Sequence, residues 1–306
     1  MCGGPVINKY GQVRGKQRYR CRTCGKQFLG GQTKQPEELW FEYQAGKQTY
    51  RQLALKYGCS IRTIQRTLDK YTGTEAKAVL PSSAVVLMDT TYFGRTFGVM
   101  VFRDATTGTV LYRKYVKHET NQLYADGLKF LRGQGVEISA VVCDGRRGLL
   151  QLCRGIPVQM CQFHQVAIIT RYLTRKPKLP AAIELRQLTQ MLKKTDKESF
   201  TGGLQLWHTK WKAFLAERTV ESTTGKSRYT HGRLRSAHRS LSCNLPWLFT
   251  WYDYPELDIP NTTNAIDGYF ADLKNKLRNH NGLSLTRKQK FIDEFLKACG
   301  PRDGNG

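Results

Sequence analysis

The chain has 306 residues, of which 40% are hydrophobic, so it can bury a full core and is long enough for more than one domain. Lys and Arg number 49 against 24 Asp and Glu, and the formal net charge of +25 indicates a polyanionic partner. Neither a signal peptide nor an apolar run of bilayer length is evident, and the nine cysteines lack the spacing of a secreted disulfide scaffold, which favours a cytoplasmic protein with reduced thiols.

Residues 1–30 are predicted to form a small zinc ribbon. Cys21 and Cys24 form a Cys-x-x-Cys followed by glycine, a tight turn that directs two thiolates at one Zn²⁺. Cys2, which is also followed by glycine, is interpreted as the second cysteine of another such turn. A structural zinc site needs four ligands, and the fourth would precede Met1, so the true start lies upstream, the chain is truncated or the site is degenerate. A metal-free loop with incidental cysteines is the alternative.

Residues 31–74 are predicted to form a helix-turn-helix domain. A helix over 48–57 is followed by a glycine-containing turn, a serine suited to cap a helix, and a second helix over 61–71. The polar face of the second helix is basic, as in a helix that reads DNA, whereas an ordinary helical hairpin is the alternative. The expected DNA contacts are Arg62, Thr63 and Arg66.

Residues 80–163 change to the alternation of β-strands and are expected to form the first part of a catalytic core. A right-handed crossover places strand 136–143 parallel to strand 84–90. Asp89 and Asp144, each at the end of its strand, then meet at one rim of a ribonuclease-H-like mixed sheet. Capping of a turn is the alternative role for each aspartate. The other expected elements are strands 96–103, 109–116 and 157–163 and helix 119–132.

Residues 164–256 show helical periodicity without a strand pattern and are predicted to be a helical insertion. Two pairs of tryptophans four residues apart are most simply explained by helix packing. The segment 221–239, rich in Ser, Thr, Gly and Arg, is interpreted as a mobile basic loop that is suited to phosphate contact.

Residues 257–299 are expected to complete the catalytic core. Asn261-Thr-Thr caps a helix that carries Asp267 in its first turn, with Lys274 and Arg278 at helical spacing after it. Three carboxylates from two strands and a helix can together hold a pair of Mg²⁺ ions for phosphoryl transfer.

The motifs together resemble those of bacterial insertion-sequence transposases of the Mutator-like DDE group. The resemblance covers nearly the whole chain and depends on the order and separation of its motifs. They are Met88-Asp89-Thr-Thr-Tyr-Phe-Gly94, Cys143-Asp144-Gly145, Cys161-Gln-Phe-His164, and Thr263-Asn-Ala-Ile-Asp267 through Lys274 to Arg278.

This resemblance implies an α/β, RNase-H-like core interrupted by an α-helical insertion and preceded by the zinc-ribbon and helix-turn-helix segments. It implies that Asp89, Asp144 and Asp267 bind two Mg²⁺ or Mn²⁺ ions, and that Cys161 and His164 are structural. Lys274 and Arg278 would contact DNA. The implied partners are double-stranded DNA, as terminal inverted repeats and target, and further copies of the chain in a nucleoid-associated oligomer. The implied reaction is strand cleavage followed by transfer to a DNA 3′-hydroxyl.

One position departs from the family pattern, in which the third acid is usually Glu. Asp267 is one methylene shorter, and a misplacement of about an ångström can cost about 10²-fold in rate. A catalytically inactive, transposase-derived DNA-binding protein or regulator is therefore the alternative function. A nuclease of the same fold that acts on RNA or DNA junctions is a third one.

Overall fold

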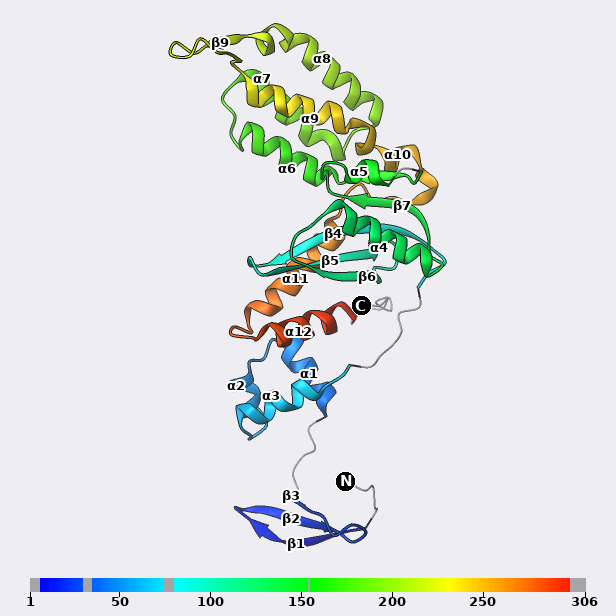
Figure 1. The fold of residues 1–306 in the computed structure, drawn as a ribbon, viewed down its shortest axis with the longest axis vertical. Helices are drawn as coiled ribbons and strands as arrows, with labels where there is room; N and C mark the ends of the chain where they lie inside the picture. Colours follow the sequence, from blue (N-terminus) through cyan, green and yellow to red (C-terminus); the bar gives the residue numbers. More distant parts are fainter. Residues whose placement is uncertain (1–5, 30–34, 74–79, 154, 298–306) are drawn as a thin grey trace. The chain divides into compact units, whose positions relative to one another are not determined.

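The computed structural model describes residues 6–29, 35–73, 80–153 and 155–297, and the chain divides into two compact units. One unit comprises residues 1–75 with 278–287, and the other comprises 76–277 with 288–306. Within the described ranges, no helix combines the length and the apolar character that a bilayer crossing requires. The ribbon is shown in Figure 1.

The N-terminal unit contains a small antiparallel sheet of order β1-β2-β3 and three helices. Thr49 begins the second helix with a reciprocal capping box, and the Ser60 side chain accepts from the Thr63 amide at the start of the third helix. Within this unit, Arg287 donates to both carboxylate oxygens of Asp69. The elements are β1 Ile7–Val13, β2 Lys16–Cys21, β3 Gln27–Leu29, α1 Pro36–Gln44, α2 Tyr50–Lys56 and α3 Ile61–Lys70.

A five-stranded mixed sheet forms the centre of the second unit, with strand order β6-β5-β4-β7-β8. β4, β5 and β6 are antiparallel neighbours, whereas β7 and β8 continue from β4 in parallel. The parallel placement of β7 beside β4, expected from a right-handed crossover, is thus confirmed. This order is consistent with the predicted RNase-H-like fold. The strands are β4 Ser83–Phe93, β5 Phe97–Asp104, β6 Val110–Val116, β7 Glu137–Cys143 and β8 Val158–Met160.

The two faces of the sheet pack against different elements. Val86 and Met88 share a core with Tyr124 of α4 (Asn121–Gly133), while Val85 and Leu87 point to the opposite face. Alternate residues of a strand point to opposite faces, so one strand serves both cores. In Figure 1, α4 covers one face of the sheet and α11 lies on the other.

Helices make up most of the remainder of the second unit. The expected strand 157–163 ends at Met160 because Cys161 already caps a helix; a short apolar run does not distinguish the two structures. The prediction of a loop over residues 221–239 was wrong, because most of this segment belongs to an antiparallel hairpin and to the start of a helix. The helices and hairpin strands are α5 Leu149–Leu152, α6 Gln162–Leu173, α7 Pro180–Gln190, η1 Met191–Lys193, α8 Lys197–Ala216, β9 Arg218–Val220, β10 Ser227–Tyr229, α9 Gly232–Leu248, α10 Thr250–Asp253, η2 Pro255–Leu257, α11 Asn264–Arg278 and α12 Leu285–Lys297.

Gly127 allows α4 to lie close against the sheet. A Cβ at this position would stand 2.6 Å from two ring atoms of Phe102, which is fully buried. We expect Gly127→Ala to lower the free energy of unfolding by about 1–3 kcal/mol, the usual cost of overpacking. Gly133→Ala is the matched control, because nothing lies within 4 Å of its added Cβ in the same helix. Urea denaturation of both variants measures the difference, and equal stabilities would contradict the close packing.

Candidate active site

Asp89 lies on β4, and Asp144 directly follows β7, the parallel strand beside it. The last paired residues of β4 and β7 are Leu87 and Val142, and the two aspartates stand two positions beyond them. Side chains two residues apart share a face, so both carboxylates project to the face on which Leu87 and Val142 pack against Ile259.

The expected position of Asp89 at the very end of its strand was wrong. β4 continues to Phe93, and Asp89 pairs with Val101 of β5. The strand extends further because β4 and β5 form a hairpin, whereas the pairing of β4 with β7 stops at Leu87. The aspartate therefore lies where the sheet splits, with a neighbour on one side only.

Asp267 is held in the first turn of α11 by the residues that precede the helix. The buried Thr263 hydroxyl lies 3.1 Å from Asp267 Oδ2 and 3.2 Å from Cys161 Sγ, and the Thr263 amide donates to the same sulfur over 3.3 Å. The Cys161 amide donates to the carbonyl of Cys143, the residue before Asp144. Cys161 thus connects the end of β7 with the start of α11.

The electrostatics of Asp89 connect it with each of the other two carboxylates. Burial raises the pKa of Asp89 to about 7, and the neighbouring carboxylates Asp267 and Asp144 act in the same direction, against the Thr90 amide and His164. Like charges held in a partly buried site are costly unless a cation or a proton compensates them. The donor set consists of hard carboxylate oxygens, which divalent Mg²⁺ or Mn²⁺ prefers.

Each carboxylate is turned towards a local donor. Asp89 Oδ1 accepts from the Thr90 amide over 2.8 Å, Asp144 Oδ1 accepts from the Arg146 amide over 3.1 Å, and Asp267 accepts from Thr263. In this arrangement, no three His, Cys, Asp or Glu side chains of the described residues converge on one metal position. The residues fit a divalent ion in chemistry and burial, and side-chain rotation would be needed to bring their oxygens together.

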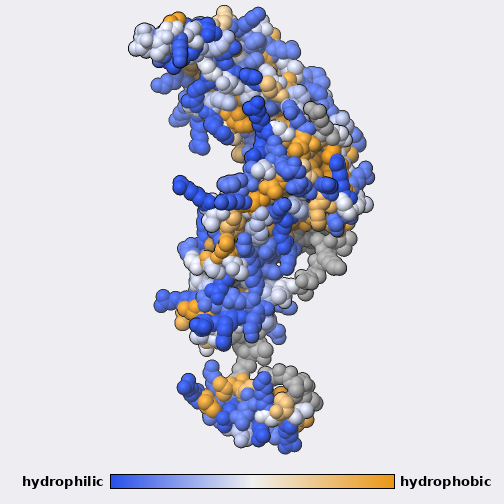
Figure 2. Space-filling model, in the orientation of Figure 1, coloured by the Kyte–Doolittle hydropathy of each residue, from blue (hydrophilic) through white to orange (hydrophobic). Residues whose placement is uncertain are grey.

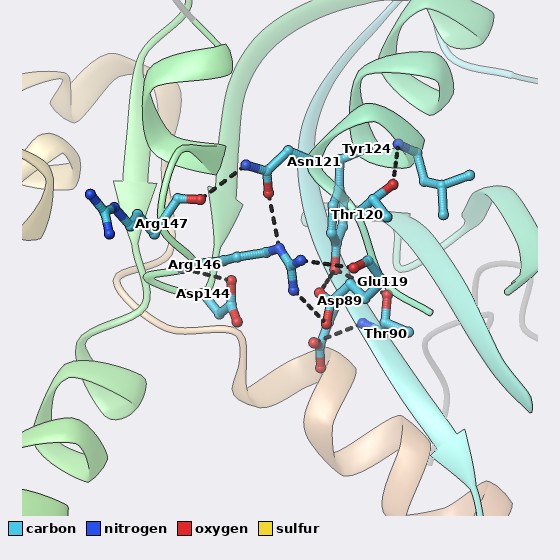
Figure 3. A network of polar contacts seen from close by, with 10 residues as sticks. Asp89, Thr90, Glu119, Thr120, Asn121, Tyr124, Asp144, Arg146 and Arg147 are labelled. Carbon is cyan, nitrogen blue, oxygen red and sulfur yellow. Dashed lines mark hydrogen bonds and ion pairs between the residues drawn. The ribbon is translucent and has the colours of Figure 1, made fainter. Parts of the chain in front are cut away.

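A polar network links the two strands that carry Asp89 and Asp144 (Figure 3). Arg146 reaches the Glu119 carbonyl over 2.7 Å and the Glu119 carboxylate over 3.4 Å. Glu119 in turn accepts from the Tyr124 hydroxyl, which lies 3.0 Å from the hydroxyl of Thr90. Glu119, Tyr124 and Arg146 lie outside the sequence motifs, and their distance along the chain from Thr90 gave no signal. They fix the loop after β7 against β4 and the start of α4.

Cys161 and His164, expected to be structural, lie beside the carboxylates. Hydrogen bonding to Cys161 raises the pKa of His164 to about 9, and Asp267 and Asp89 act in the same direction. The buried thiol has a lowered pKa, because its hydrogen bonds with His164 and Thr263 outweigh the effect of burial. The thiol and the imidazole thus stabilise each other's charged forms, and the hydrogen bonds of Cys161 with Thr263 tie the start of α6 to the helix of the third acid.

The remaining residues singled out from the sequence lie on helices and loops. Arg62 and Arg66 are exposed on α3, whereas the Thr63 hydroxyl lies 2.9 Å from the Ser60 hydroxyl within the helix cap. Lys274 is half-buried on α11, two turns after Asp267, and Arg278 is exposed at its end. Of the expected zinc ligands, Cys21 is buried and Cys24 exposed, and Cys2 lies outside the described residues, so the zinc site stays a prediction.

Neither a protein-family model nor a curated protein matches the chain. Among solved structures it is similar to the catalytic core domain of HTLV-2 integrase in complex with magnesium, in a dimeric form (15% identity, TM-score 0.22, 50% of this chain and 97% of that one) and a trimeric form (15%, 0.22, 52% and 98%). It is also similar to a chain of the simian T-cell lymphotropic virus intasome in complex with the PP2A regulatory subunit B56 gamma (15%, 0.23, 65% and 72%). These scores are low, so an assignment of function depends on the geometry of the chain itself.

Proposed function

We propose that the protein is a DDE-type DNA transposase, a polynucleotidyl transferase that cleaves DNA at the ends of a mobile element and joins it to a target. The observation that carries the proposal is the interaction of Asp89 with Asp144 and Asp267 at the point where β4 and β7 separate. Carboxylates on neighbouring parallel strands, faced by a third from a helix, suit metal-dependent phosphoryl transfer.

Asp89, Asp144 and Asp267 would hold two Mg²⁺ or Mn²⁺ ions, which when bound stabilise the attacking and leaving oxygens of an in-line displacement. In the first reaction the oxygen of water forms a bond to phosphorus and the DNA 3′-oxygen leaves, giving a 3′-hydroxyl and a 5′-phosphate. In the second, that 3′-hydroxyl attacks a phosphate of the target and displaces its 3′-oxygen. No covalent bond between protein and DNA is needed, and Lys274 would hold a backbone phosphate.

The direct test is incubation of the protein with a duplex that carries the inverted repeat flanking its gene, in Mg²⁺, Mn²⁺ or EDTA. Strand nicks that depend on the metal and leave a 3′-hydroxyl are expected. Tight binding of the duplex without nicking in either metal would instead support a DNA-binding regulator. The shorter third acid and the separate local donors of the three carboxylates favour that second function.

Thr263 provides a test of the third acid. We expect Thr263→Val, which removes the hydroxyl shared by Asp267 and Cys161, to raise the Mn²⁺ concentration for half-maximal nicking about 10- to 100-fold. Thr263→Ser keeps the hydroxyl and should keep the metal requirement. Circular dichroism checks that both variants are folded, and an unchanged metal requirement in a folded Thr263→Val would show that Thr263 does not support Asp267.

DNA recognition is assigned to α3. Arg62 and Arg66 are exposed four residues apart on one face, so both can reach the same groove. Their joint replacement by Ala should reduce the slope of log affinity against log salt by about 1.8, or about 0.9 for each phosphate that is no longer neutralised. Lys129→Ala with Arg132→Ala on α4 removes the same charge from exposed positions and is the control. Equal slopes for the two double variants would contradict recognition by α3.

A further inference from the structure

A second candidate site lies in the helical insertion, in a cavity of about 540 Å³ between α8, α9 and the β9–β10 hairpin. This volume falls within the range of about 300–1,000 Å³ that small-molecule sites occupy. Its wall contains two arginines and two histidines but no Asp or Glu. The surface of this part of the molecule is mainly hydrophilic in the view of Figure 2. The cavity therefore favours an anionic, polar ligand.

Flat rings form one part of the wall. The imidazoles of His208 and His238 stack with centroids 4.5 Å apart and an angle of 10° between their planes. Trp207 stacks on His238 from α8, at 5.3 Å and 25°, and fixes the orientation of that ring. Burial and the neighbouring His208 and Arg235 lower the pKa of His238, so this ring is neutral at neutral pH. The His238 ring is therefore packed against two other rings, and it supports the His208 ring, which lines the same cavity and can stack against a planar ligand.

Two arginines, one turn apart on α9, form another part of the wall. Arg235 lies over the Tyr229 ring at 3.6 Å and donates to the Leu215 carbonyl, so its guanidinium is held in place. For Arg239, which is exposed, no hydrogen-bond or ion-pair partner occurs among the residues that the structure describes. α9 carries three arginines and no Asp or Glu, so no side chain of α9 repels an anion that is bound at this wall.

We propose that this cavity binds a nucleoside phosphate unit, with its base against the imidazole of His208 and its phosphate against Arg235 and Arg239. Cationic side chains beside stacking platforms are the combination that holds unpaired nucleotides. An inorganic anion alone could bind the arginines but could not stack on the imidazole. An unpaired nucleotide of DNA is the favoured source, given the net charge of +25, and a free nucleotide has the same chemistry. The site is separate from the carboxylates and adds a second contact with DNA to the proposed function.

The test measures binding in EDTA, where no strand cleavage can occur. The full chain is titrated into a duplex with one bulged 2-aminopurine and into the same duplex with that base paired. We expect tighter binding of the bulged duplex and quenching of its fluorescence by stacking. His208→Ala should weaken binding of the bulged duplex about 5- to 100-fold, as loss of one stacking side chain does, and leave the paired duplex little changed. Arg239→Ala should also weaken binding of the bulged duplex more than that of the paired one. Arg233→Ala, on the same helix but outside the cavity wall, should not alter the preference.

Competition with dAMP separates the two sources of the ligand. Displacement by dAMP that depends on Arg239, without a preference for the bulged duplex, would assign the cavity to a free nucleotide. The proposal is overturned if the protein binds both duplexes equally and does not bind dAMP. It is also overturned if the folded Arg239→Ala and His208→Ala variants both still prefer the bulged duplex. A preserved preference combined with absent metal-dependent nicking would count against the transposase assignment alone.

Discussion

Asp89→Asn is expected to lower the rate of metal-dependent strand nicking by about 10³-fold or more. The substitution preserves the size of the side chain but removes the carboxylate whose pKa both Asp144 and Asp267 raise. Metal ions contribute several kcal/mol of charge stabilisation to phosphoryl transfer, and each 1.4 kcal/mol corresponds to a factor of about ten. The measurement is the single-turnover rate on radiolabelled inverted-repeat DNA at saturating Mn²⁺.

Asp126→Asn is the matched control, because it removes the same charge from an exposed position on α4. It should nick DNA at the wild-type rate. Asp267→Glu adds one methylene to the third acid, and a rate increase of up to about 10²-fold would show that the shorter acid limits the reaction. Nicking by Asp89→Asn at a rate close to wild type would remove the carboxylate cluster from the mechanism.

The central sheet could be predicted from the sequence because its strands are short apolar runs separated by clear turns. The parallel placement of β7 beside β4 followed from one rule of handedness, and it brings Asp89 and Asp144 two positions beyond the last paired residues of the two strands. A local signal also located the start of α3 at Ser60, whose side chain accepts from the first turn of that helix, whereas the predicted helix 48–57 began before Thr49, the residue that caps α2. In both cases the information is contained within a few neighbouring residues.

The support of the site could not be predicted, because it depends on contacts between distant residues. Tyr124 reaches Thr90 across 34 positions, and Thr263 reaches Cys161 across 102. Neither pair has a spacing that a periodic pattern reveals. The hairpin at Arg218–Tyr229 was missed for a different reason, since its strands are short, exposed and polar and so lack the apolar alternation of a buried strand.

Asp89 should also make the stability of the metal-free protein fall as the pH rises. Its pKa is raised to about 7 in the folded chain, while a carboxyl of an unfolded chain has a pKa of about 3.9. The folded state therefore retains a proton that the unfolded state releases, and the resulting stability is fully present below about pH 4 and lost as the pH rises through 7. The Asp89 side chain is only partly buried, so solvent screens its charge. We therefore expect the free energy of unfolding to fall by about 2–4 kcal/mol across this pH window rather than by the full effect of the shift.

Asp89→Asn resembles the protonated carboxyl and should remove this part of the pH dependence, so that in EDTA the variant is more stable than wild type at pH 8 but not at pH 4. Urea denaturation of both proteins at the two pH values measures the effect, and the difference between them cancels groups that do not interact with Asp89. Mn²⁺ should stabilise wild type at pH 8 and have less effect on the variant, because a ligand that binds only the folded state shifts unfolding by mass action. Parallel pH profiles for the two proteins would show that Asp89 ionises as an ordinary surface carboxyl. In that case the charge repulsion that makes the site suitable for a divalent ion would be absent.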